Sequence, residues 1–486
     1  MSLAVVLLLG VGVYFTLRTR AVQRESLGQA LQIMRRGQSS AIGISALGSF
    51  MLGLAMRAGP GNIVGVTGAI TVAGPGALFW MWVAALFGMS TAFIESVLAQ
   101  LFKERKHNDY VGGLPFYGRR ILGGHRSIGI VLSIAFIVYA LFNVPAQTFN
   151  VFTALGMMAD TVTGSSSDRQ SPLYFGIALL LVTSCAWLIL GGIRRVVAYT
   201  NLIVPVMAVV FCVVSLLIIA FNLSVFPAFF ASVVRGAFAP DAVFGGIMGI
   251  ALAEGVRRGL MSNEAGQGTI TMAAAVADND HPCEQGLVQG LGVFIDTIVI
   301  CTMTGFIVVL AQLWSGAATP EQWQLASAAK LAVYLDSLRV LIPVQLADLV
   351  VVIISLCYAL FAFTTLLGMI SFAEISANFI SRSDHFILFI RLLGSLFFVP
   401  FGALTVLAGL ELGNLWAISD LTNIIMVFIN VPILLLGAPL ALKALAHYRA
   451  SGGGRFLSVE IGLETEHWVE AEQTHLGVPV GQHRQP

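Results

Sequence analysis

Charged residues are scarce in this chain of 486 residues. Lys, Arg, Asp and Glu together make up 10% of it, whereas 57% is hydrophobic and the mean hydropathy is +0.88. A soluble domain carries about 25% charged residues, so the composition indicates an integral membrane protein. The net charge of +1 gives no reason to expect a nucleic acid or another polyanion as a partner.

Residues for covalent or metal chemistry are also few. The five cysteines show no CxxC spacing and mostly lie in apolar runs, which predicts buried thiols and not a disulfide framework. The sequence has no phosphate-binding GxxxxGK(S/T) motif, no HExxH and no Cys/His metal-ligand spacing. An ATPase or an intramembrane protease is therefore not supported, and we expect neither an enzyme nor a bound cofactor.

Long apolar runs dominate the rest of the chain. A helix that crosses a bilayer needs about 20 such residues, and eleven candidates lie at about 3–17, 41–73, 77–102, 128–158, 173–192, 197–222, 241–277, 286–313, 344–380, 385–409 and 413–443. The first has its arginines on the wrong flank for a signal peptide, so we interpret it as a retained helix. The prediction is an all-α membrane protein of about eleven transmembrane helices.

Basic residues gather in alternate loops. Clusters follow the first, third, fifth and eleventh segments, and by the positive-inside rule these loops are cytoplasmic. We therefore predict a multi-pass protein of the cell membrane with its N-terminus outside and its C-terminus inside. The tail 446–486 is expected to be cytoplasmic and partly disordered. In the longest outer loop, the stretch 321–338 either covers the mouth as a lid or is a surface connection.

Two of the eleven segments are interrupted by glycine and polar residues. Segment 41–73 contains RAGPGN at 57–62, and segment 241–277 contains a longer polar stretch at 254–268. Without the first segment, ten remain in two blocks of five, and each block begins with an interrupted segment. Paired broken helices point to the binding site of a secondary transporter. We predict a 5+5 inverted repeat (41–222 and 241–445) after an N-terminal helix and loop (1–40).

The first interruption has the chemistry of a binding site. Gly59 and Gly61 let a ligand approach the backbone, and Pro60 removes a donor. A helix restarting at Asn62 presents amide groups that suit a carboxylate, and the freed carbonyls suit Na⁺. A glycine-rich kink for close packing explains these residues equally well. Arg57 would snorkel, pair with a carboxylate or act as a gate.

The second interruption carries four charges and two amides. Ionisable groups inside a membrane are costly and usually functional. We assign Arg258, Asn263 and Glu264 to an inner gate or to a layer behind the site. Ile247 and Ala251, in the apolar half that precedes them, are expected to face the substrate. The alternative is an ordinary loop at the cytoplasmic surface.

Six motifs occur in order along the chain: GPGNIVGV (59–66), GPGALFWMW (74–82), GGLPFY (112–117), RGLMSNEAG (258–266), QGL (285–287) and FIDTIVICT (294–302). Together they resemble the alanine or glycine:cation symporter family, the sodium:alanine symporters, over roughly residues 1–445. The resemblance implies a fold similar to that of the leucine transporter (LeuT-like) and Na⁺-driven uptake of small neutral amino acids.

The resemblance also implies roles for individual polar residues. Asn62 corresponds to an asparagine of the family's alanine site, where it would bind the substrate's carboxylate or amine. Gln147, near Asn150, corresponds to a glutamine of the same site; an interhelical hydrogen bond is the alternative for it.

A Na⁺ site is implied by the adjacent hydroxyls of Thr364 and Thr365. In LeuT-like proteins such hydroxyls face the first break, and here they would complete the site with the carbonyls of Gly59 and Ile63. The alternative is that each hydroxyl bonds back to its own helix.

Two residues depart from the family's pattern. Pro60 stands where the family usually has threonine, and Met369 stands where it commonly has tryptophan. Because methionine is smaller and adaptable, we predict a substrate range shifted from alanine and glycine toward other neutral amino acids. Asp296 is the intramembrane charge that we would test first, as a gate or as a structural contact.

The predicted function is therefore symport, in which Na⁺ and a small neutral amino acid enter together by alternating access. One alternative keeps the fold and replaces Na⁺ with H⁺. Another is a channel or a non-transporting sensor. Repeated pore-lining elements are absent, and the tail is too short for a sensor's output domain.

Overall fold

The computed structural model of the chain describes residues 2–36, 43–107, 109–164, 171–238, 247–315, 330–409, 412–463, 465 and 467–468. Across these residues the fold is a bundle of helices. A small antiparallel hairpin, β1 (Glu104–Lys106) and β2 (Asp109–Val111), is the sheet found among them. The prediction of an all-α membrane protein is confirmed.

All eleven predicted segments contain helices. They are α1 (Ser2–Arg18); α3 (Ala46–Arg57), η1 (Gly61–Gly65) and α4 (Val66–Ala73); α5 (Gly76–Leu101); α7 (Arg126–Thr163); α8 (Pro172–Leu190); α9 (Ile193–Phe221); α11 (Ile247–Asn263) and α12 (Ile270–Ala275); α13 (Pro282–Val293), η4 (Phe294–Cys301) and α14 (Thr302–Ser315); α17 (Val344–Ala377); α18 (Asp384–Leu392), η6 (Leu393–Phe398) and α19 (Val399–Leu407); and α20 (Leu412–Ala450). The elements η1, η4 and η6 are π-helical.

By length and composition, 8 helical stretches of the described residues can cross a membrane, or up to 9 if α1 and α2 (Gln23–Arg35), bent by 78°, form one span. The two interrupted segments consist of shorter helices. Eleven crossings therefore stay a prediction.

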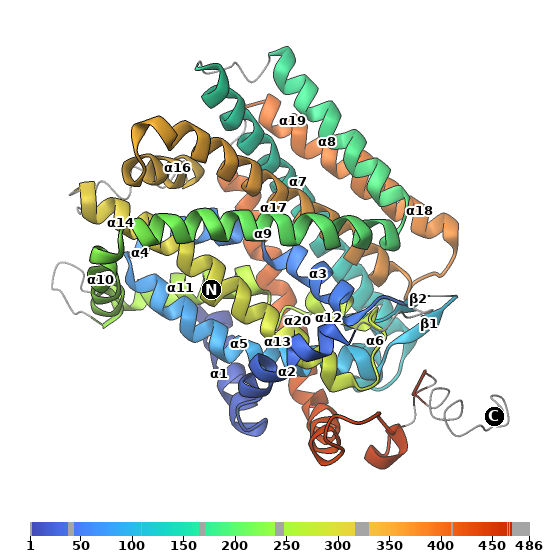
Figure 1. Cartoon of the computed structure of the whole chain (residues 1–486). Helices are drawn as coiled ribbons and strands as arrows, with labels where there is room; N and C mark the ends of the chain where they lie inside the picture. Colours follow the sequence, from blue (N-terminus) through green and yellow to red (C-terminus); the bar gives the residue numbers. More distant parts are fainter. Residues whose placement is uncertain are drawn as a thin grey trace.

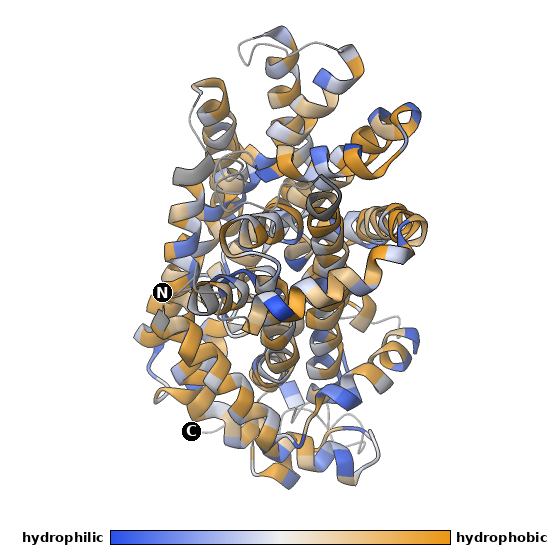
Figure 2. Cartoon of the chain, turned by 90° about the vertical axis from the view of Figure 1, so that its left-hand side faces the viewer, coloured by the Kyte–Doolittle hydropathy of each residue, from blue (hydrophilic) through white to orange (hydrophobic). Residues whose placement is uncertain are grey.

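The helices of the two blocks interlock. Helix α7 packs along α17, and α5 packs against both α11 and α13 (Figure 1). Hydrophobic residues make up most of the helices (Figure 2). The outer faces of α8 and α9 expose large apolar side chains such as Leu179, Leu180 and Leu202, as expected for helices against lipid.

The first interruption lies inside the bundle. Helix α3 ends at Arg57, and Ala58 leaves the helical region (φ −70°, ψ 78°). The π-helical turn η1 then leads into α4. Such turns are rare and often occur at functional sites.

The second interruption is shorter than the sequence suggests. Helix α11 continues to Asn263, so the polar residues 254–263 are helical and the break is confined to 264–269. Glu264, Gly266 and Gly268 have positive φ there (58°, 86° and 81°). The side chains of the break are buried, so the alternative of a surface loop is wrong.

Several helices lie outside the predicted segments: α2, α6 (Leu114–Ile121), α10 (Phe226–Phe238) and α16 (Lys330–Leu341). Helix α16 covers the second half of the stretch expected to be a lid or a connection, and residues 321–329 lie outside the described part. Leu331, Tyr334 and Leu335 of α16 are buried, and the helix packs on α14, α17 and α4. It is therefore part of the folded body.

Part of the C-terminal tail is also packed. Trp468 is buried, and its Nε1 donates to the carbonyl of Gln100 (3.0 Å). Phe456 stacks edge-on against Trp468. Lys103 Nζ donates to the carbonyl of Ala277 (2.7 Å) and lies over the ring of Tyr110 (4.2 Å). Residues 469–486, also expected to be partly disordered, lie outside the described residues.

Lys103 should make stability depend on pH. Burial lowers its pKa from 10.5 to about 7. Between these values the unfolded chain binds the proton and the folded chain does not, so stability should rise with pH, by up to about 1.4 kcal/mol per unit. Thermal unfolding of the detergent-purified protein at pH 7 to 10 measures this slope. The Lys103→Met variant should show a flatter profile, and an unchanged slope would contradict the assignment.

Candidate functional site

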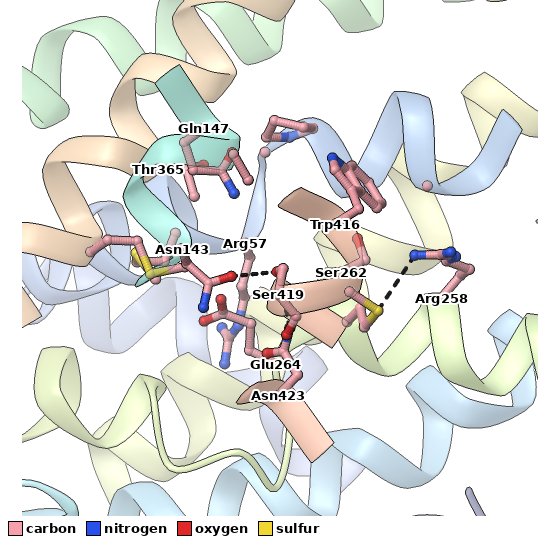
Figure 3. Close-up of a pocket in the computed structure, with 18 of the residues that line it drawn as sticks. Arg57, Asn143, Gln147, Arg258, Ser262, Glu264, Thr365, Trp416, Ser419 and Asn423 are labelled. Atoms are coloured by element: carbon pink, nitrogen blue, oxygen red, sulfur yellow. Dashed lines mark hydrogen bonds between the residues drawn. The ribbon is translucent and has the colours of Figure 1, made fainter. Parts of the chain in front are cut away.

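A cavity of about 50 Å³ lies between the two interruptions (Figure 3). A single water needs about 10–15 Å³, so the space suits a few waters or one small molecule. Its wall comes from α3, η1, α7, α11, α17, α20 and the breaks, and is lined by Met56, Arg57, Gly59, Pro60, Gly61, Gly65, Tyr139, Asn143, Ala146, Gln147, Arg258, Met261, Ser262, Glu264, Thr365, Met369, Trp416, Ser419 and Asn423.

Asn62 stabilises the first break from behind the cavity. Its Oδ1 accepts a hydrogen bond from the amide of Gly59 (2.8 Å), and its Nδ2 donates to Asp296 Oδ1 (2.7 Å). The side chain is buried and is not part of the cavity wall. The role expected for it as a direct substrate ligand is therefore not supported: the amide already caps the broken backbone.

Asp296, on η4, joins the two breaks. Its carboxylate accepts from Asn62 of the first break, from Ser262 Oγ beside the second (2.8 Å) and from Thr297 Oγ1 (2.8 Å). Within the described residues no Lys or Arg forms an ion pair with it. A buried carboxylate that lacks a cation is costly unless something positive approaches it.

The two adjacent threonines of α17 differ in what they contact. Thr365 lines the cavity, and its Oγ1 donates to the carbonyls of Ala55 on α3 (3.1 Å) and Phe361 (2.9 Å). Thr364 bonds only to Phe361 (3.1 Å) among the contacts described and is not part of the wall. The expected contact with the first break is thus made by Thr365. The hydroxyl of Thr364 bonds back to its own helix. It points away from α3, because neighbouring helical residues point about 100° apart.

Gly59 fits tightly against Thr365. A Cβ built on Gly59 would lie 2.6 Å from Thr365 Oγ1. The carbonyl of Ile63 in η1 accepts from Thr67 Oγ1 (2.7 Å). The hydroxyl of Thr365 therefore lies against the backbone of the first break at Gly59, whereas the Ile63 carbonyl is bonded within its own helix.

Arg57 links the first break to the second. Its Nε donates to the carbonyl of Asn263 (3.0 Å), and its Nη1 donates to the carbonyl of Gln289 (3.0 Å). Arg57 is 1% exposed and lines the cavity, so snorkelling is excluded. Asn263 donates to Thr297 (3.3 Å), and Glu264, on the cavity wall, accepts from Thr269 Oγ1 (2.8 Å).

Glu95 holds the second break in place. Its carboxylate accepts from the amides of Gly266 (3.3 Å) and Gly268 (3.2 Å) and from Asn430 Nδ2 (3.1 Å). These bonds give the buried carboxylate a structural role at the break.

Arg258 lies apart from Asn263 and Glu264. It forms ion pairs with Glu254 (3.7 Å) and Asp420 (3.6 Å) and lies 5.2 Å from the ring of Trp416. Lys330 is the first residue of α16, in the predicted outer loop. Its Nζ lies 5.7 Å from the centre of the Trp416 ring. Arg258 thus precedes the break by more than one helical turn and lies on the side of Lys330, so its assignment to an inner gate stays a prediction.

The remaining predicted residues fall into two groups. Gln147 and Met369 line the cavity with Gly59 and Gly61. Ala251 instead packs in a cluster of small residues on α4 and α5, and Asn150 accepts from the hydroxyl of Tyr358 (3.0 Å). The backbone of Ile247 begins α11, and its side chain lies outside the described atoms.

Sequence reasoning missed a polar stripe on each of two helices. On α7, Tyr139 and Asn143 precede Gln147 at four-residue spacing, so all three share one face. On α20, Trp416, Ser419 and Asn423 follow one another at spacings of three and four residues and also share a face, and Ser419 donates to Asn143. Polar residues at helical spacing inside apolar segments were the signal that could have found them.

The arrangement can bind without reacting. No group of three or more His, Cys, Asp and Glu that could hold a metal occurs in the part of the chain that the structure describes. The cavity offers backbone oxygens, four hydroxyls (Tyr139, Ser262, Thr365 and Ser419), amides, two arginines and a carboxylate. These groups suit a zwitterion and a hard monovalent cation.

Known proteins resemble this chain in sequence. A sequence profile described as "Sodium:alanine symporter family" matches residues 1–454. The amino-acid carrier protein AlsT of Bacillus subtilis is 33% identical over 442 residues, which is 91% of this chain and 88% of AlsT. The sodium/alanine symporter AgcS of Methanococcus maripaludis is 36% identical over 372 residues, or 76% of this chain and 78% of AgcS.

A solved structure shares the fold. It is that of MhsT, a transporter of the LeuT fold, in complex with L-phenylalanine. The TM-score is 0.55 at 12% identity, and the match covers 92% of this chain and 94% of MhsT. The prediction of a LeuT-like fold is thereby confirmed.

Proposed function

Because the chain belongs to the sodium:alanine symporter family, we propose that it couples the entry of Na⁺ to the uptake of a small neutral amino acid. The family and the fold are those of multi-pass membrane transporters and not of enzymes, and they support an amino-acid symporter. The proposal includes the identity of the ion, the substrate class and the orientation in the cell membrane, with the N-terminus outside.

One observation carries it: the polar cavity lies between two broken helices, where backbone groups are available to ligands. Irregular backbone at membrane depth survives only where protein, water or a ligand satisfies it. A transport site meets this condition, since ions and substrates supply the missing partners during the cycle.

We assign the coupling ion to the side of the cavity formed by α17 and the first break. Na⁺ would lie among the carbonyls of Gly59 and Ile63 and the hydroxyl of Thr365; the hydroxyl of Thr364, also predicted from the sequence, is not part of the cavity wall. Thr365 is the better supported of the two hydroxyls because it already reaches the carbonyl of Ala55 across the helix interface.

The amino acid would lie beside the ion. Gly59 and Gly61 leave room for its carboxylate near the restarted helix, and the Oε1 of Gln147, buried and without a partner among the described atoms, suits its ammonium group. Met369 bounds the pocket where the family commonly has tryptophan. Neutral amino acids larger than alanine should therefore compete for uptake, and strict preference for alanine and glycine would contradict this.

Transport then needs the two breaks to move together. Arg57 and Asp296 join the first break to the second, whereas Arg258, on the cavity wall, pairs with Asp420. We assign Arg57 and Asp296 to the connection between the two breaks, and we assign Arg258 and Asp420 to a gate. By linkage, Na⁺ should raise the affinity for the amino acid, and the amino acid should raise that for Na⁺.

Uptake into liposomes tests the proposal. The purified protein is reconstituted, and uptake of labelled alanine, glycine, serine and glutamine is measured with and without an inward Na⁺ gradient. Uptake should persist when an ionophore collapses the proton gradient and stop when K⁺ replaces Na⁺. Uptake that follows the proton gradient without Na⁺ would favour H⁺ coupling, and currents that do not saturate would favour a channel.

The two threonines provide a matched pair of variants. Thr365→Val should raise the Na⁺ concentration for half-maximal uptake about tenfold, since one ligand or hydrogen bond contributes about 1.4 kcal/mol. Thr364→Val, which removes a hydroxyl bonded to its own helix, should change it less than threefold. Equal effects of both variants would contradict the assignment of Thr365 as the main hydroxyl ligand.

A further inference from the structure

We propose that Trp416 selects amino acids whose side chains carry a neutral hydrogen-bond acceptor, a hydroxyl or a carboxamide. The inference rests on the proposed function, because it takes the cavity to be the amino-acid site. Trp416 is on α20 and lines the cavity. In Figure 3 it faces the space from the side opposite Gln147 and Thr365.

The indole ring is held in a fixed orientation. Arg258 lies 5.2 Å from its centre and Lys330 5.7 Å, and cations within about 6 Å of the ring attract it. Arg258 is itself held by Glu254 and Asp420. The ring is thus positioned before any ligand arrives, which limits the entropy lost on binding.

The polar edge of the ring is unused. The Nε1 atom is buried and has no hydrogen-bond partner among the described atoms. The other polar groups on this face of α20 are engaged: Ser419 Oγ donates to Asn143 Oδ1, and Asn423 Nδ2 donates to the carbonyl of Ser419 (2.8 Å). A buried donor without an acceptor is costly, so a ligand atom that accepts from Nε1 is favoured.

The position of Trp416 assigns this contact to the substrate's side chain. The carboxylate and ammonium groups of the amino acid are assigned above to the first break and to Gln147, and Gln147 lies across the cavity from Trp416 (Figure 3). An amino acid held there directs its side chain toward α20. Arg258, packed on the same ring, disfavours cationic side chains. Serine, threonine and asparagine fit both the small cavity and the need for a neutral acceptor.

Two pairs of substrates isolate the acceptor. Serine differs from alanine by one hydroxyl, and asparagine resembles leucine in shape. Initial uptake rates from subsaturating labelled substrate give the serine/alanine and asparagine/leucine ratios in liposomes containing the wild type or Trp416→Phe. Phenylalanine keeps a ring for Arg258 and removes the N–H donor. Trp82→Phe is the control, since Trp82 Nε1 donates to Thr302 (2.7 Å) outside the cavity.

We expect the wild type to prefer serine over alanine and asparagine over leucine by about three- to tenfold, the effect of one hydrogen bond. Trp416→Phe should bring both ratios close to one, and Trp82→Phe should leave them at the wild-type values. A wild-type ratio of one, or equal losses for both members of a pair in Trp416→Phe, would overturn the inference while leaving Na⁺-driven uptake intact. Absence of uptake for every amino acid would instead overturn the proposed function, and this inference with it.

Discussion

Replacing Asp296 with asparagine is expected to lower Na⁺-driven amino-acid uptake about a hundredfold. The variant keeps the size of the side chain and removes its charge, which Asn62 and the hydroxyls of Ser262 and Thr297 stabilise. A hydrogen bond to a charged group contributes about 1.5–3 kcal/mol, against about 1 for a neutral one. Weakening two or three of them costs about 3 kcal/mol, or about a hundredfold.

The measurement is uptake by equal amounts of reconstituted protein, with monodispersity in detergent as the check on folding. Glu374→Gln is the matched control. Glu374 is also buried and intramembrane, but it is paired with Arg391 (2.6 Å) away from the cavity. We expect that variant to lose stability and to keep transport per folded molecule. Wild-type uptake by Asp296→Asn would show that the carboxylate only fills space.

Replacing Gly59 with alanine is expected to reduce uptake about thirtyfold. The new Cβ would lie 2.6 Å from Thr365 Oγ1, a contact that requires the break and α17 to separate. Overpacking of this kind costs about 1–3 kcal/mol, and it falls where we place the ion. The half-saturating Na⁺ concentration should rise as well, because the oxygens of the two elements move apart.

Gly65→Ala is the control for this variant. Gly65 also lines the cavity, but an added Cβ would meet only Arg258 Cδ, at 4.0 Å. Alanine is also the better helix former. Near-normal uptake by Gly65→Ala together with a strong loss in Gly59→Ala would assign the effect to the contact with Thr365. Similar losses in both would indicate that any methyl group in this helix blocks the cavity.

The fold was largely predictable because membrane-spanning helices can be recognised directly in the sequence. Lipid demands long apolar runs, so all eleven segments contain helices where the composition places them. Breaks inside such runs are equally visible, and both interruptions were found. The length of the second interruption was not predicted. Residues 254–263 form a polar stretch that is nevertheless helical, because Arg257 and Arg258 pair with acidic residues on α11 and α20.

The direction of a side chain was harder to predict than its position in the chain. Asn62 is at the break, as expected, yet its amide turns to Asp296 and not to the cavity. Thr364 and Thr365 are neighbours, and only Thr365 reaches α3. Such differences depend on how α17 and η4 rotate against the first break, which is decided by packing between residues about 230 to 310 positions apart in the chain.

These long-range bonds also bear on how the protein is made. The partners of Asn62, Arg57 and Glu95 lie in the second half of the chain, and Asp296 follows Asn62 by 234 residues. At about 5–20 residues per second, a ribosome takes roughly 10 to 50 seconds to cover that interval. Until then the first five helices hold polar groups in the bilayer without their final partners. Insertion of the first half should therefore depend on water or on the insertion machinery to shield the nascent break, and a chain truncated before η4 is expected to be degraded.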